Sequence, residues 1–298
     1  MKAANPYAPH KSLFGEPRVV VEAALPDRED VYCPLCNREP EPFAVDFQGF
    51  QLVSCTRCGL QFQSPRPIFG QLTRLVYGDG YHPVEEAATA RARQTQFTRQ
   101  LTHLERWLPS ARRALLDVGC GSGTFLRFAR DRGWQLAGTD VVFSQWAEIA
   151  GARLWVGQLG EIDFGSLRFD VVRFNHVLEH TQDPLAELRR AHELLAPEGI
   201  LLIGVPNLAG LSLRVKSWQS RLSLKSHRWR HYAALHHVWF FTPRTLRRLA
   251  DAAGFGLIHW ETPMLPRGGA VGSLGAVYRA LLQATRSGSN LDYYGKRL

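Results

Sequence analysis

The sequence predicts an α/β fold, in which a doubly wound parallel sheet follows a small N-terminal metal-binding ribbon. Two observations lead to this prediction. Four cysteines form two C-x-x-C pairs near the start of the chain, and a buried strand runs through a glycine-rich turn into a helix at residues 115–126. Beyond that turn, apolar strand-like runs alternate with helical segments, a pattern typical of a doubly wound sheet with its ligand at the carboxyl ends of the strands.

The composition limits the class of protein. The chain has 298 residues, 45% of them hydrophobic, which is enough for one large domain or two modest ones. No run approaches the roughly 18 apolar residues that span a bilayer, and the polar start lacks a secretory signal, so we expect a cytoplasmic protein. The net charge of +9 favours an anionic partner such as phosphate, nucleic acid or a lipid headgroup. A solvated, arginine-rich surface is the alternative.

The patterns divide the chain into an extension, a ribbon, a linker, a core and a tail. Within the core, one segment is unusually long and basic for this fold. The predicted parts are an N-terminal extension at 1–30, a zinc ribbon at 31–64, a helical linker at 65–110, a core at 111–262 with a basic lid insertion at 207–237, and a C-terminal tail at 263–298.

The paired cysteines predict a structural zinc site. Two residues separate Cys33 from Cys36 and Cys55 from Cys58, a spacing that lets all four thiolates reach one tetrahedral Zn²⁺. Four protein ligands leave no open position, which indicates a structural rather than a catalytic metal. Disulfides and a redox dithiol are the alternatives, and the missing export signal and the doubled motif make both weaker.

The glycine-rich turn is the candidate cofactor site. Gly119, Gly121 and Gly123 lie at alternate positions, where a missing Cβ lets a ligand approach the backbone. Asp117 precedes the turn, and its carboxylate suits a cationic ligand and would repel a phosphate. Cys120 lies inside the turn. We interpret it as a small side chain that fills the turn, with a nucleophilic thiol as the alternative.

The remaining elements follow in the order that a doubly wound sheet requires. A second strand ends at Asp140, whose carboxylate can accept both ribose hydroxyls of a nucleoside. Asp183 and Thr242 are the predicted N-caps of two helices, each followed by proline at the first helical position. The other predicted strands lie at 152–156, 170–174 and 199–205, with a helix at 272–284 and a candidate last strand at 291–294.

Together these segments resemble class I S-adenosylmethionine-dependent methyltransferases from about residue 114 to 255. The motifs that carry the resemblance are Leu115–Leu126, Asp140, Phe169–Val172, His176–His180 and Pro197–Leu202. The resemblance implies a Rossmann-like seven-stranded methyltransferase sheet with S-adenosylmethionine as cofactor. The cofactor-binding residues that it implies are Asp117, Gly119, Cys120, Gly121, Gly123, Asp140, Val141 and Asn175.

The N-terminal segment extends the resemblance. Cys55–Phe62, Pro65–Pro67, Tyr77 and Tyr81 resemble bacterial methyltransferases that carry an N-terminal zinc ribbon. That group includes sugar C-methyltransferases and enzymes found with polysaccharide and natural-product pathways. It implies a sugar, a glycan precursor or a secondary metabolite as the methyl acceptor, although those sugar enzymes carry a second large domain after the core.

Histidines near the fourth and fifth strands are candidate bases for proton removal, because imidazole titrates near neutral pH. His180 lies where the acceptor is expected, His176 is at the strand end beside the cofactor, and His236 follows the fifth strand. Tyr77 and Tyr81 are candidates to close over the cofactor. The alternatives are hydrogen-bonded structural histidines and tyrosines that pack between domains.

The basic insertion leaves three interpretations open. Residues 211–231 contain six basic residues and no acidic residue, interleaved with tryptophan and leucine. Such a segment suits a lid over the acceptor, a membrane surface, or a phosphorylated substrate or RNA. The predicted function is therefore methyl transfer to O or C of a small molecule, either free or lipid-linked. The alternatives are an RNA methyltransferase and a quinone-type O-methyltransferase at the membrane surface.

Overall fold

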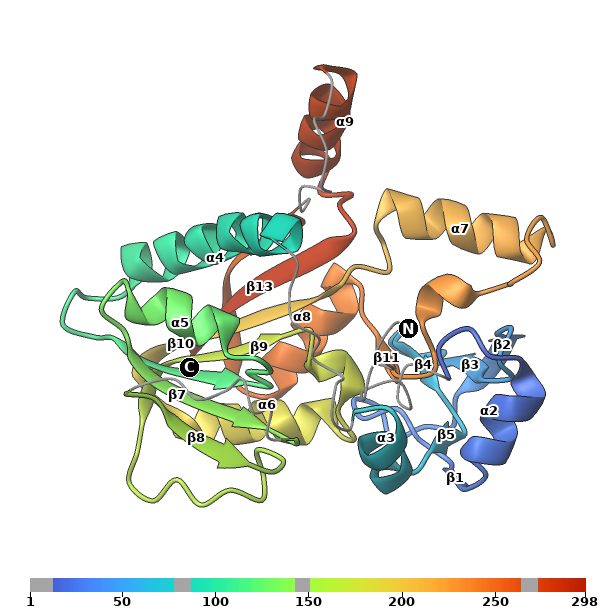
Figure 1. Ribbon diagram of the computed structural model, residues 1–298, viewed down its shortest axis with the longest axis horizontal. Coiled ribbons are helices and arrows are strands. Elements are labelled where there is room, and N and C mark those ends of the chain that lie inside the picture. Colours follow the sequence, from blue (N-terminus) through green and yellow to red (C-terminus); the bar gives the residue numbers. More distant parts are fainter. Residues whose placement is uncertain (1–12, 78–86, 143–150, 264–272) are drawn as a thin grey trace, which may run out of the picture.

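The computed structural model describes residues 13–77, 87–142, 151–263 and 273–298 (Figure 1). A seven-stranded sheet forms its centre, in the order β12-β13-β10-β9-β6-β7-β8. The five strands from β10 to β8 are parallel, and β13 runs antiparallel to both of its neighbours. The strands are β6 (Ala114–Val118), β7 (Gln135–Asp140), β8 (Arg153–Val156), β9 (Phe169–Asn175), β10 (Leu195–Pro206), β12 (Phe255–Glu261) and β13 (Asn290–Arg297).

This sheet confirms the predicted Rossmann-like fold class. The candidate strand at 291–294 is the middle of β13, which lies between β10 and β12. The order in which successive strands are added to the sheet reverses between β6 and β9. These two strands are paired, although β7 and β8 lie between them in the chain. Ligands of doubly wound sheets bind at such a switch point, at the carboxyl ends of the strands.

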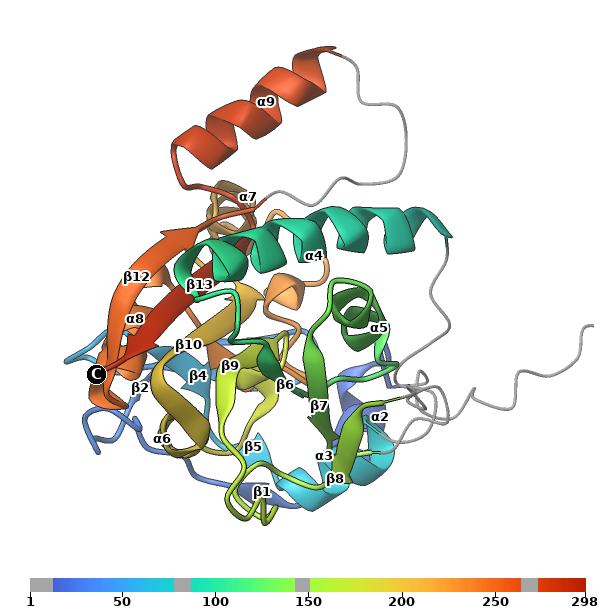
Figure 2. The same cartoon turned by 90° about the vertical axis from the view of Figure 1, so that its left-hand side faces the viewer.

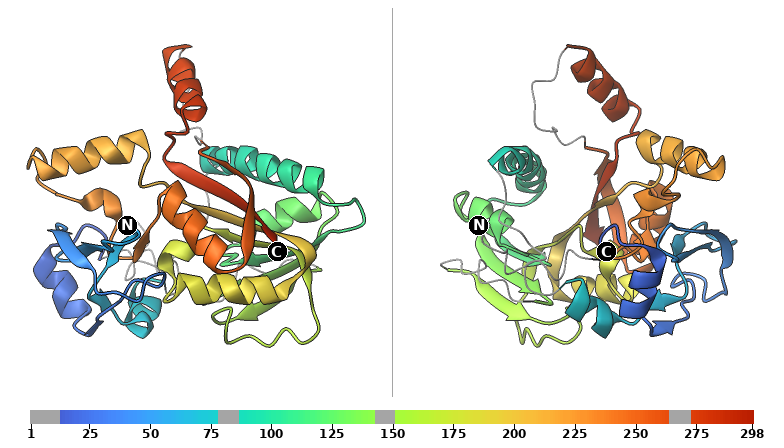
Figure 3. Two further views of the ribbon diagram at one scale, coloured as in Figure 1. Left: turned by 180° about the vertical axis from the view of Figure 1, so that it is seen from behind. Right: turned by 45° about the vertical axis from the view of Figure 1, so that its right-hand side comes forward.

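Helices cover both faces of the sheet (Figures 2 and 3). On one face α4 (Ala87–Trp107) and α5 (Thr124–Arg130) pack around Leu101, Phe125 and Trp134. On the other face α6 (Pro184–Leu194) and α8 (Pro243–Ala252) pack through Leu188 and Leu249. The two apolar layers explain why the central strands are hydrophobic on both sides.

The predicted helix starts are confirmed at atomic detail. The Asp183 side chain accepts hydrogen bonds from the N–H groups of Leu185 and Ala186, and Thr242 accepts one from Thr245 in a reciprocal capping box. Each bond satisfies a backbone donor that has no partner inside the helix. The two caps therefore fix where α6 and α8 begin.

The ribbon forms a small sheet with a strand from far along the chain. Its own strands β2, β3 and β4 pair with β11 in the order β11-β4-β3-β2, and Trp239 of β11 lies opposite Phe62 of β4. The elements of this lobe are α2 (Arg18–Ala24), β1 (Arg28–Glu29), β2 (Glu41–Val45), β3 (Gln51–Ser54), β4 (Gln61–Gln63), β5 (Arg66–Pro67), α3 (Phe69–Leu75) and β11 (Trp239–Phe240).

The insertion at 207–237 has two structurally different halves. Its first half forms α7 (Leu211–Arg221), which extends away from the sheet (Figures 1 and 3). Its second half contains the short helix η2 (Arg230–Tyr232), and Trp229 and Tyr232 are buried in one apolar cluster with Phe50 of the ribbon lobe. The second half therefore holds the ribbon lobe on the core.

One further helix, α9 (Ser273–Ala284), stands out from the body of the molecule (Figure 1). It lies within the predicted helix at 272–284. Among the described residues, no helix has the length and apolar character that crossing a membrane requires.

Candidate active site

A pocket opens at the carboxyl ends of the central parallel strands and holds about 710 Å³ of empty space, part of it open to solvent. Ligands of doubly wound sheets bind in crevices at this position, and such crevices combine apolar walls with a few polar groups. The core strands supply one wall, and the ribbon lobe supplies Phe69 and Tyr77. The predicted site residues that line it are Tyr77, Gly119, Asp140, Val141, His176 and His180.

The glycine turn has the backbone conformation that its residues predict. Gly119, Gly121 and Gly123 have φ values of 67°, 53° and 70°, in the region that favours glycine. A Cβ at Gly119 would also lie 2.3 Å from Cγ2 of Val177. The lack of a side chain at Gly119 thus allows Val177 to pack against the turn beside the pocket, while Gly121 and Gly123 shape the turn without lining the pocket.

Asp140 is held at the pocket edge by backbone donors. Its two carboxylate oxygens accept hydrogen bonds from the N–H of Gly121 at 2.8 Å and of Val142 at 3.2 Å. Hydrogen bonds of this kind orient the carboxylate. The second strand and the glycine turn are therefore joined at the point where the sequence predicts contact with a ribose.

Asp117 lies behind the turn rather than on the pocket wall. Its Oδ1 is 2.7 Å from Nη1 of Arg173, and the two side chains are only 2% and 3% exposed. The guanidinium lies 3.6 Å from the centre of the Phe125 ring and also donates to Gln100. The structure thus pairs Asp117 with a cation of the protein itself.

Cys120 and Asn175 also lie outside the pocket lining. Burial, with the charges of Asp117 and Asp140, raises the pKa of the Cys120 thiol, which keeps it protonated and a poor nucleophile. Its sulfur packs where a Cβ of Gly138 would lie. Oδ1 of Asn175 accepts hydrogen bonds from Gln96 and from Gln100 of α4.

His180 is oriented by the ribbon side of the pocket. Its Nδ1 lies 2.7 Å from the carbonyl oxygen of His236, to which the Tyr77 hydroxyl also donates at 2.8 Å. A carbonyl only accepts, so Nδ1 carries the proton and the lone pair of the neutral imidazole is on Nε2. This tautomer is the one that a proton acceptor at Nε2 requires.

His176 and Glu179 form a pair beside His180. Nδ1 of His176 lies 3.1 Å from Oε1 of the buried Glu179. Burial alone would lower the pKa of His176, but the hydrogen bond and the negative charge of Glu179 outweigh it, so the pKa is raised. His176 has φ of 55°, a strained conformation for a residue with a side chain and one that concentrates at functional sites.

His236 enters the site through its backbone. Burial and the neighbouring His180 lower the pKa of the His236 imidazole to about 3, so this ring is neutral at ordinary pH. The carbonyl of His236 accepts the hydrogen bond that orients His180, and the two imidazole rings stack with their centres 5.3 Å apart. The other predicted catalytic residue, Tyr81, lies outside the described residues.

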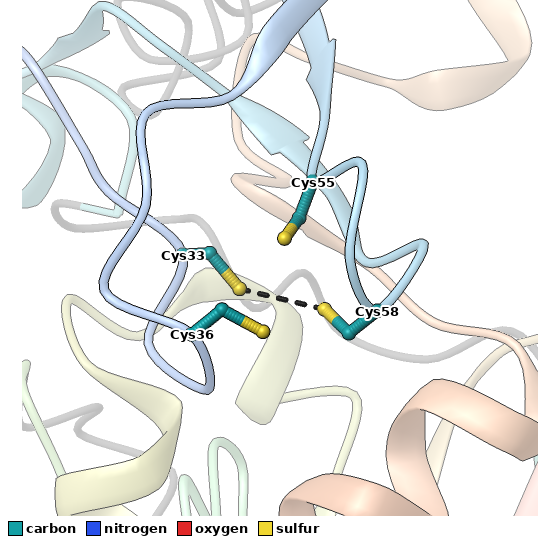
Figure 4. Close-up of side chains that lie close together, drawn as sticks. All are labelled: Cys33, Cys36, Cys55 and Cys58. Carbon is teal, nitrogen blue, oxygen red and sulfur yellow. Dashed lines mark hydrogen bonds between the residues drawn. The ribbon is translucent and has the colours of Figure 1, made fainter.

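The four ribbon cysteines converge as their spacing predicts (Figure 4). The sulfur atoms of Cys33, Cys36, Cys55 and Cys58 all lie within 4.8 Å of one another. Burial alone would raise the pKa of Cys55, but backbone N–H groups of Cys58 and Arg57 donate to its sulfur and lower the pKa to about 7. Four thiol donors in this arrangement fit a tetrahedral zinc ion.

The sequence predicts no role for several residues that line the pocket. Gln158 and Leu159 lie two and three residues after the end of β8, so their place near the carboxyl end of a predicted strand is a usable signal. Phe69 and Glu187 line the pocket from α3 and α6, and no local pattern marks either one. Burial, with Asp183 and Glu161 nearby, raises the pKa of Glu187 to about 7.

This chain is similar in sequence to one known family and to several curated proteins. Residues 83–259 match a family model described as a methyltransferase domain. Curated relatives named ubiquinone biosynthesis O-methyltransferase include one from Azorhizobium caulinodans, 32% identical over 151 residues, and one from Idiomarina loihiensis, 30% identical over 153. These alignments cover 47% of this chain and 58% and 60% of the relatives. The chain thus spans somewhat over half the length of the curated relatives that it matches.

Solved structures share the fold at low sequence identity. The 1,6-didemethyltoxoflavin-N1-methyltransferase of Burkholderia thailandensis aligns with a TM-score of 0.50 and 19% identity, covering 86% of this chain and 99% of that one. The magnesium protoporphyrin IX methyltransferase of Synechocystis PCC 6803 aligns with a TM-score of 0.50 and 15% identity, covering 74% and 91%. Both were solved with bound S-adenosylhomocysteine.

Proposed function

Because the chain belongs to the S-adenosylmethionine-dependent methyltransferases, we propose that it methylates a hydroxyl group of a small, largely apolar acceptor. S-adenosylmethionine supplies the methyl group from its sulfonium. The pocket is lined by Asp140 and Gln158 of the core and by Tyr77 of the ribbon lobe, and we place the nucleoside of the cofactor against the core strands and the acceptor toward Tyr77. The curated relatives named for ubiquinone biosynthesis support an aromatic hydroxyl acceptor.

We assign the cofactor to the strand side of the pocket. Asp140, at the end of β7, is the residue proposed to accept the ribose hydroxyls, and Gly119 lets the cofactor approach the backbone. Val141 and Leu159 supply apolar contacts beside them. Asp117 is proposed to act indirectly, by fixing the strand before the turn through Arg173.

Replacing Gly119 with Ala is expected to weaken S-adenosylhomocysteine binding at least tenfold, measured by calorimetry. The new methyl group would overlap Val177 at 2.3 Å, at a positive φ, and a loss of only about 1.4 kcal/mol corresponds to a tenfold change. Gly133→Ala is the matched control, because Gly133 also has a positive φ but an added Cβ there would meet no atom within 4 Å. Equal affinities for the two variants would contradict this cofactor position.

The proposed chemistry is based on the orientation and position of the His180 ring. Its Nδ1 proton is held by the His236 carbonyl, and the ring lines the pocket, so Nε2 is poised to take the proton of an acceptor hydroxyl. The neighbouring Glu179 carboxylate, 4.0 Å from Nε2, stabilises the imidazolium that this transfer creates. Burial and orientation of this kind are what a general base requires.

Replacing His180 with Gln is expected to lower methyl transfer to a prenylated catechol about a hundredfold or more, the usual contribution of a general base. S-adenosylhomocysteine affinity should change little, which separates chemistry from cofactor binding. Transfer assays with a nucleotide-linked deoxysugar and with RNA run in parallel. Transfer to either one, with none to the catechol, would overturn the proposed acceptor class. Methylation of a sugar carbon and methylation of RNA remain the alternative predictions for this chain.

We further propose that α7 brings the enzyme to a membrane that holds its acceptor. Leu211, Val215, Trp218 and Leu222 follow one another at helical spacing and are between 41% and 59% exposed. Basic residues accompany this apolar stripe, and residues 211–231 contain no acid. Apolar and basic side chains on one exposed helix suit the surface of an anionic bilayer.

The double change Trp218→Ser and Leu222→Ser is expected to abolish most binding to phosphatidylglycerol-containing vesicles in a flotation assay. The wild-type protein should bind, and added salt should weaken its binding, because the basic residues act through space. Val156→Ser is the control, since Val156 is similarly exposed, at 55%, on β8. A wild-type protein that stays unbound would rule out this surface.

We also infer that the four ribbon cysteines hold a structural Zn²⁺. All four sulfur atoms come from loops that meet against the core, and Arg248 of α8 donates to the carbonyl of Cys58 at 3.3 Å. An all-thiolate set with no open position stabilises a fold rather than activating water. The ribbon in turn carries the chain into α3 and Tyr77, which form one wall of the pocket.

A further inference from the structure

A second group of metal-ligating side chains lies outside both the pocket and the ribbon. It is formed where α4 crosses the outer strands β12 and β13 (Figure 2). His103 comes from α4, and His259 and Glu261 come from β12. One ligand atom from each of the three lies within 4.8 Å of the others. The function proposed above uses none of these residues.

The geometry of the two elements explains why these side chains meet. Arg99, His103 and Trp107 follow one another at intervals of four along α4, so they share one helix face. His259 and Glu261 alternate along β12 and point to the same face of the sheet. Their neighbours on β13 are Tyr294 and Asp292 in register, and this face is turned toward α4.

The ring of His103 is held in place by its neighbours. Its ring stacks on Trp107 at 5.1 Å and lies 5.2 Å from the ring of His259, and its Nε2 is 3.6 Å from Oε1 of Glu261.

Arg99 holds one of the two oxygen atoms of the Glu261 carboxylate. Its Nε donates to Oε1 of Glu261 at 2.8 Å, and its Nη2 donates to Asp292 at 3.0 Å. Within the described ranges, no hydrogen bond reaches Oε2 of Glu261. The side chains of His103 and Glu261 are 25% and 15% exposed, so a solvent ion can reach them.

We propose that His103, His259 and Glu261 bind one divalent transition-metal ion, such as Zn²⁺ or Ni²⁺, with water completing the coordination. Two imidazoles and a carboxylate are the ligands that such ions take. The ion joins the middle of α4 to the edge strand β12. The same helix carries Gln96 and Gln100, which donate to Asn175 at the end of β9, so the metal stiffens a helix that borders the cofactor half of the core.

Ni²⁺ is the probe, because an all-thiolate zinc site retains its own ion while imidazole and carboxylate accept nickel. Calorimetric titration of the zinc-loaded protein is expected to show one saturable Ni²⁺ per chain and a raised melting temperature. His259→Gln and Glu261→Gln should each weaken this binding at least tenfold. His227→Gln is the control, since His227 is an exposed histidine outside the cluster.

Three results would overturn the proposal. The first is a wild-type protein without saturable Ni²⁺ binding. The second is equal binding by wild type and both variants. The third is binding that survives in His259→Gln but is lost in His237→Gln, because Glu179, His180 and His237 are the other histidine-containing group in the described chain with ligand atoms this close. Circular dichroism of each variant separates lost binding from lost folding, and His103→Gln gives a third variant if one of the others fails to fold.

Discussion

Cys58→Ser is expected to release zinc and to unfold the ribbon lobe, while the central sheet retains its secondary structure. Structural zinc in small domains contributes about 10–16 kcal/mol of apparent binding free energy at neutral pH, the largest single contribution considered for this chain. Phe50, Leu52 and Phe62 of the ribbon are also buried, but we expect that they do not replace the metal in so small a segment. Zinc content and near-ultraviolet circular dichroism measure the effect, and methyl transfer should fall because Tyr77 and Phe69 lose their places in the pocket wall.

Cys120→Ser is the matched control for this experiment. Cys120 is the only other cysteine in the sequence, and its partly buried thiol lies in the glycine turn rather than near the ribbon cluster. This variant should keep one zinc and its ribbon signal. Should Cys58→Ser retain both zinc and native dichroism, the four-thiolate site would be wrong. A chelator titration of the wild-type protein provides the same test without a mutation.

The second large effect is expected at the buried pair behind the glycine turn. Arg173→Met should lower the free energy of unfolding by about 3–5 kcal/mol, because it leaves the Asp117 carboxylate buried without its partner. Urea unfolding at neutral pH measures the change. The double variant Asp117→Leu with Arg173→Met should recover most of the loss, since an apolar pair of similar volume needs no compensating charge.

Arg112→Met provides the comparison within the same sheet. Arg112 pairs with Asp170 at 2.6 Å, but these side chains are 26% and 13% exposed, and ion pairs that water reaches contribute about 1 kcal/mol or less. If Arg112→Met and Arg173→Met lowered the free energy of unfolding equally, burial of the ion pair would not determine how much stability is lost when one partner is removed. Cofactor affinity should fall only for Arg173→Met, because that pair supports the strand before Gly119.

The parts of the fold that could be predicted are those with local signals. Alternating strands and helices, the caps at Asp183 and Thr242, and the glycines of the turn each depend on a few neighbouring residues. The order of the parallel strands then follows from general rules of connection. The two cysteine pairs carry enough information in their spacing alone to predict their convergence. Local signals of this kind are sufficient to place Gly119, Asp140 and the cysteine cluster.

The features that could not be predicted depend on contacts between distant segments. Nothing near Arg173 indicates that it pairs with Asp117, so the sequence alone assigns the Asp117 carboxylate to the cofactor. The basic composition of 207–237 hides the buried residues Trp229 and Tyr232, which hold the ribbon lobe. Likewise the sequence points to the His236 ring as a base, whereas the carbonyl of that residue makes the hydrogen bond with His180.

The pairing of β11 with β4 has a consequence for how the chain is made. Strand β4 (Gln61–Gln63) leaves the ribosome early, but its partner Trp239–Phe240 is synthesised only after most of the central sheet. Because domains fold in the order of their synthesis, the ribbon must wait with one sheet edge unpaired, and such edges recruit foreign strands. Early zinc capture would protect the nascent chain during that interval. The ribbon sheet is therefore expected to be completed only after the central strands up to β10 have been synthesised.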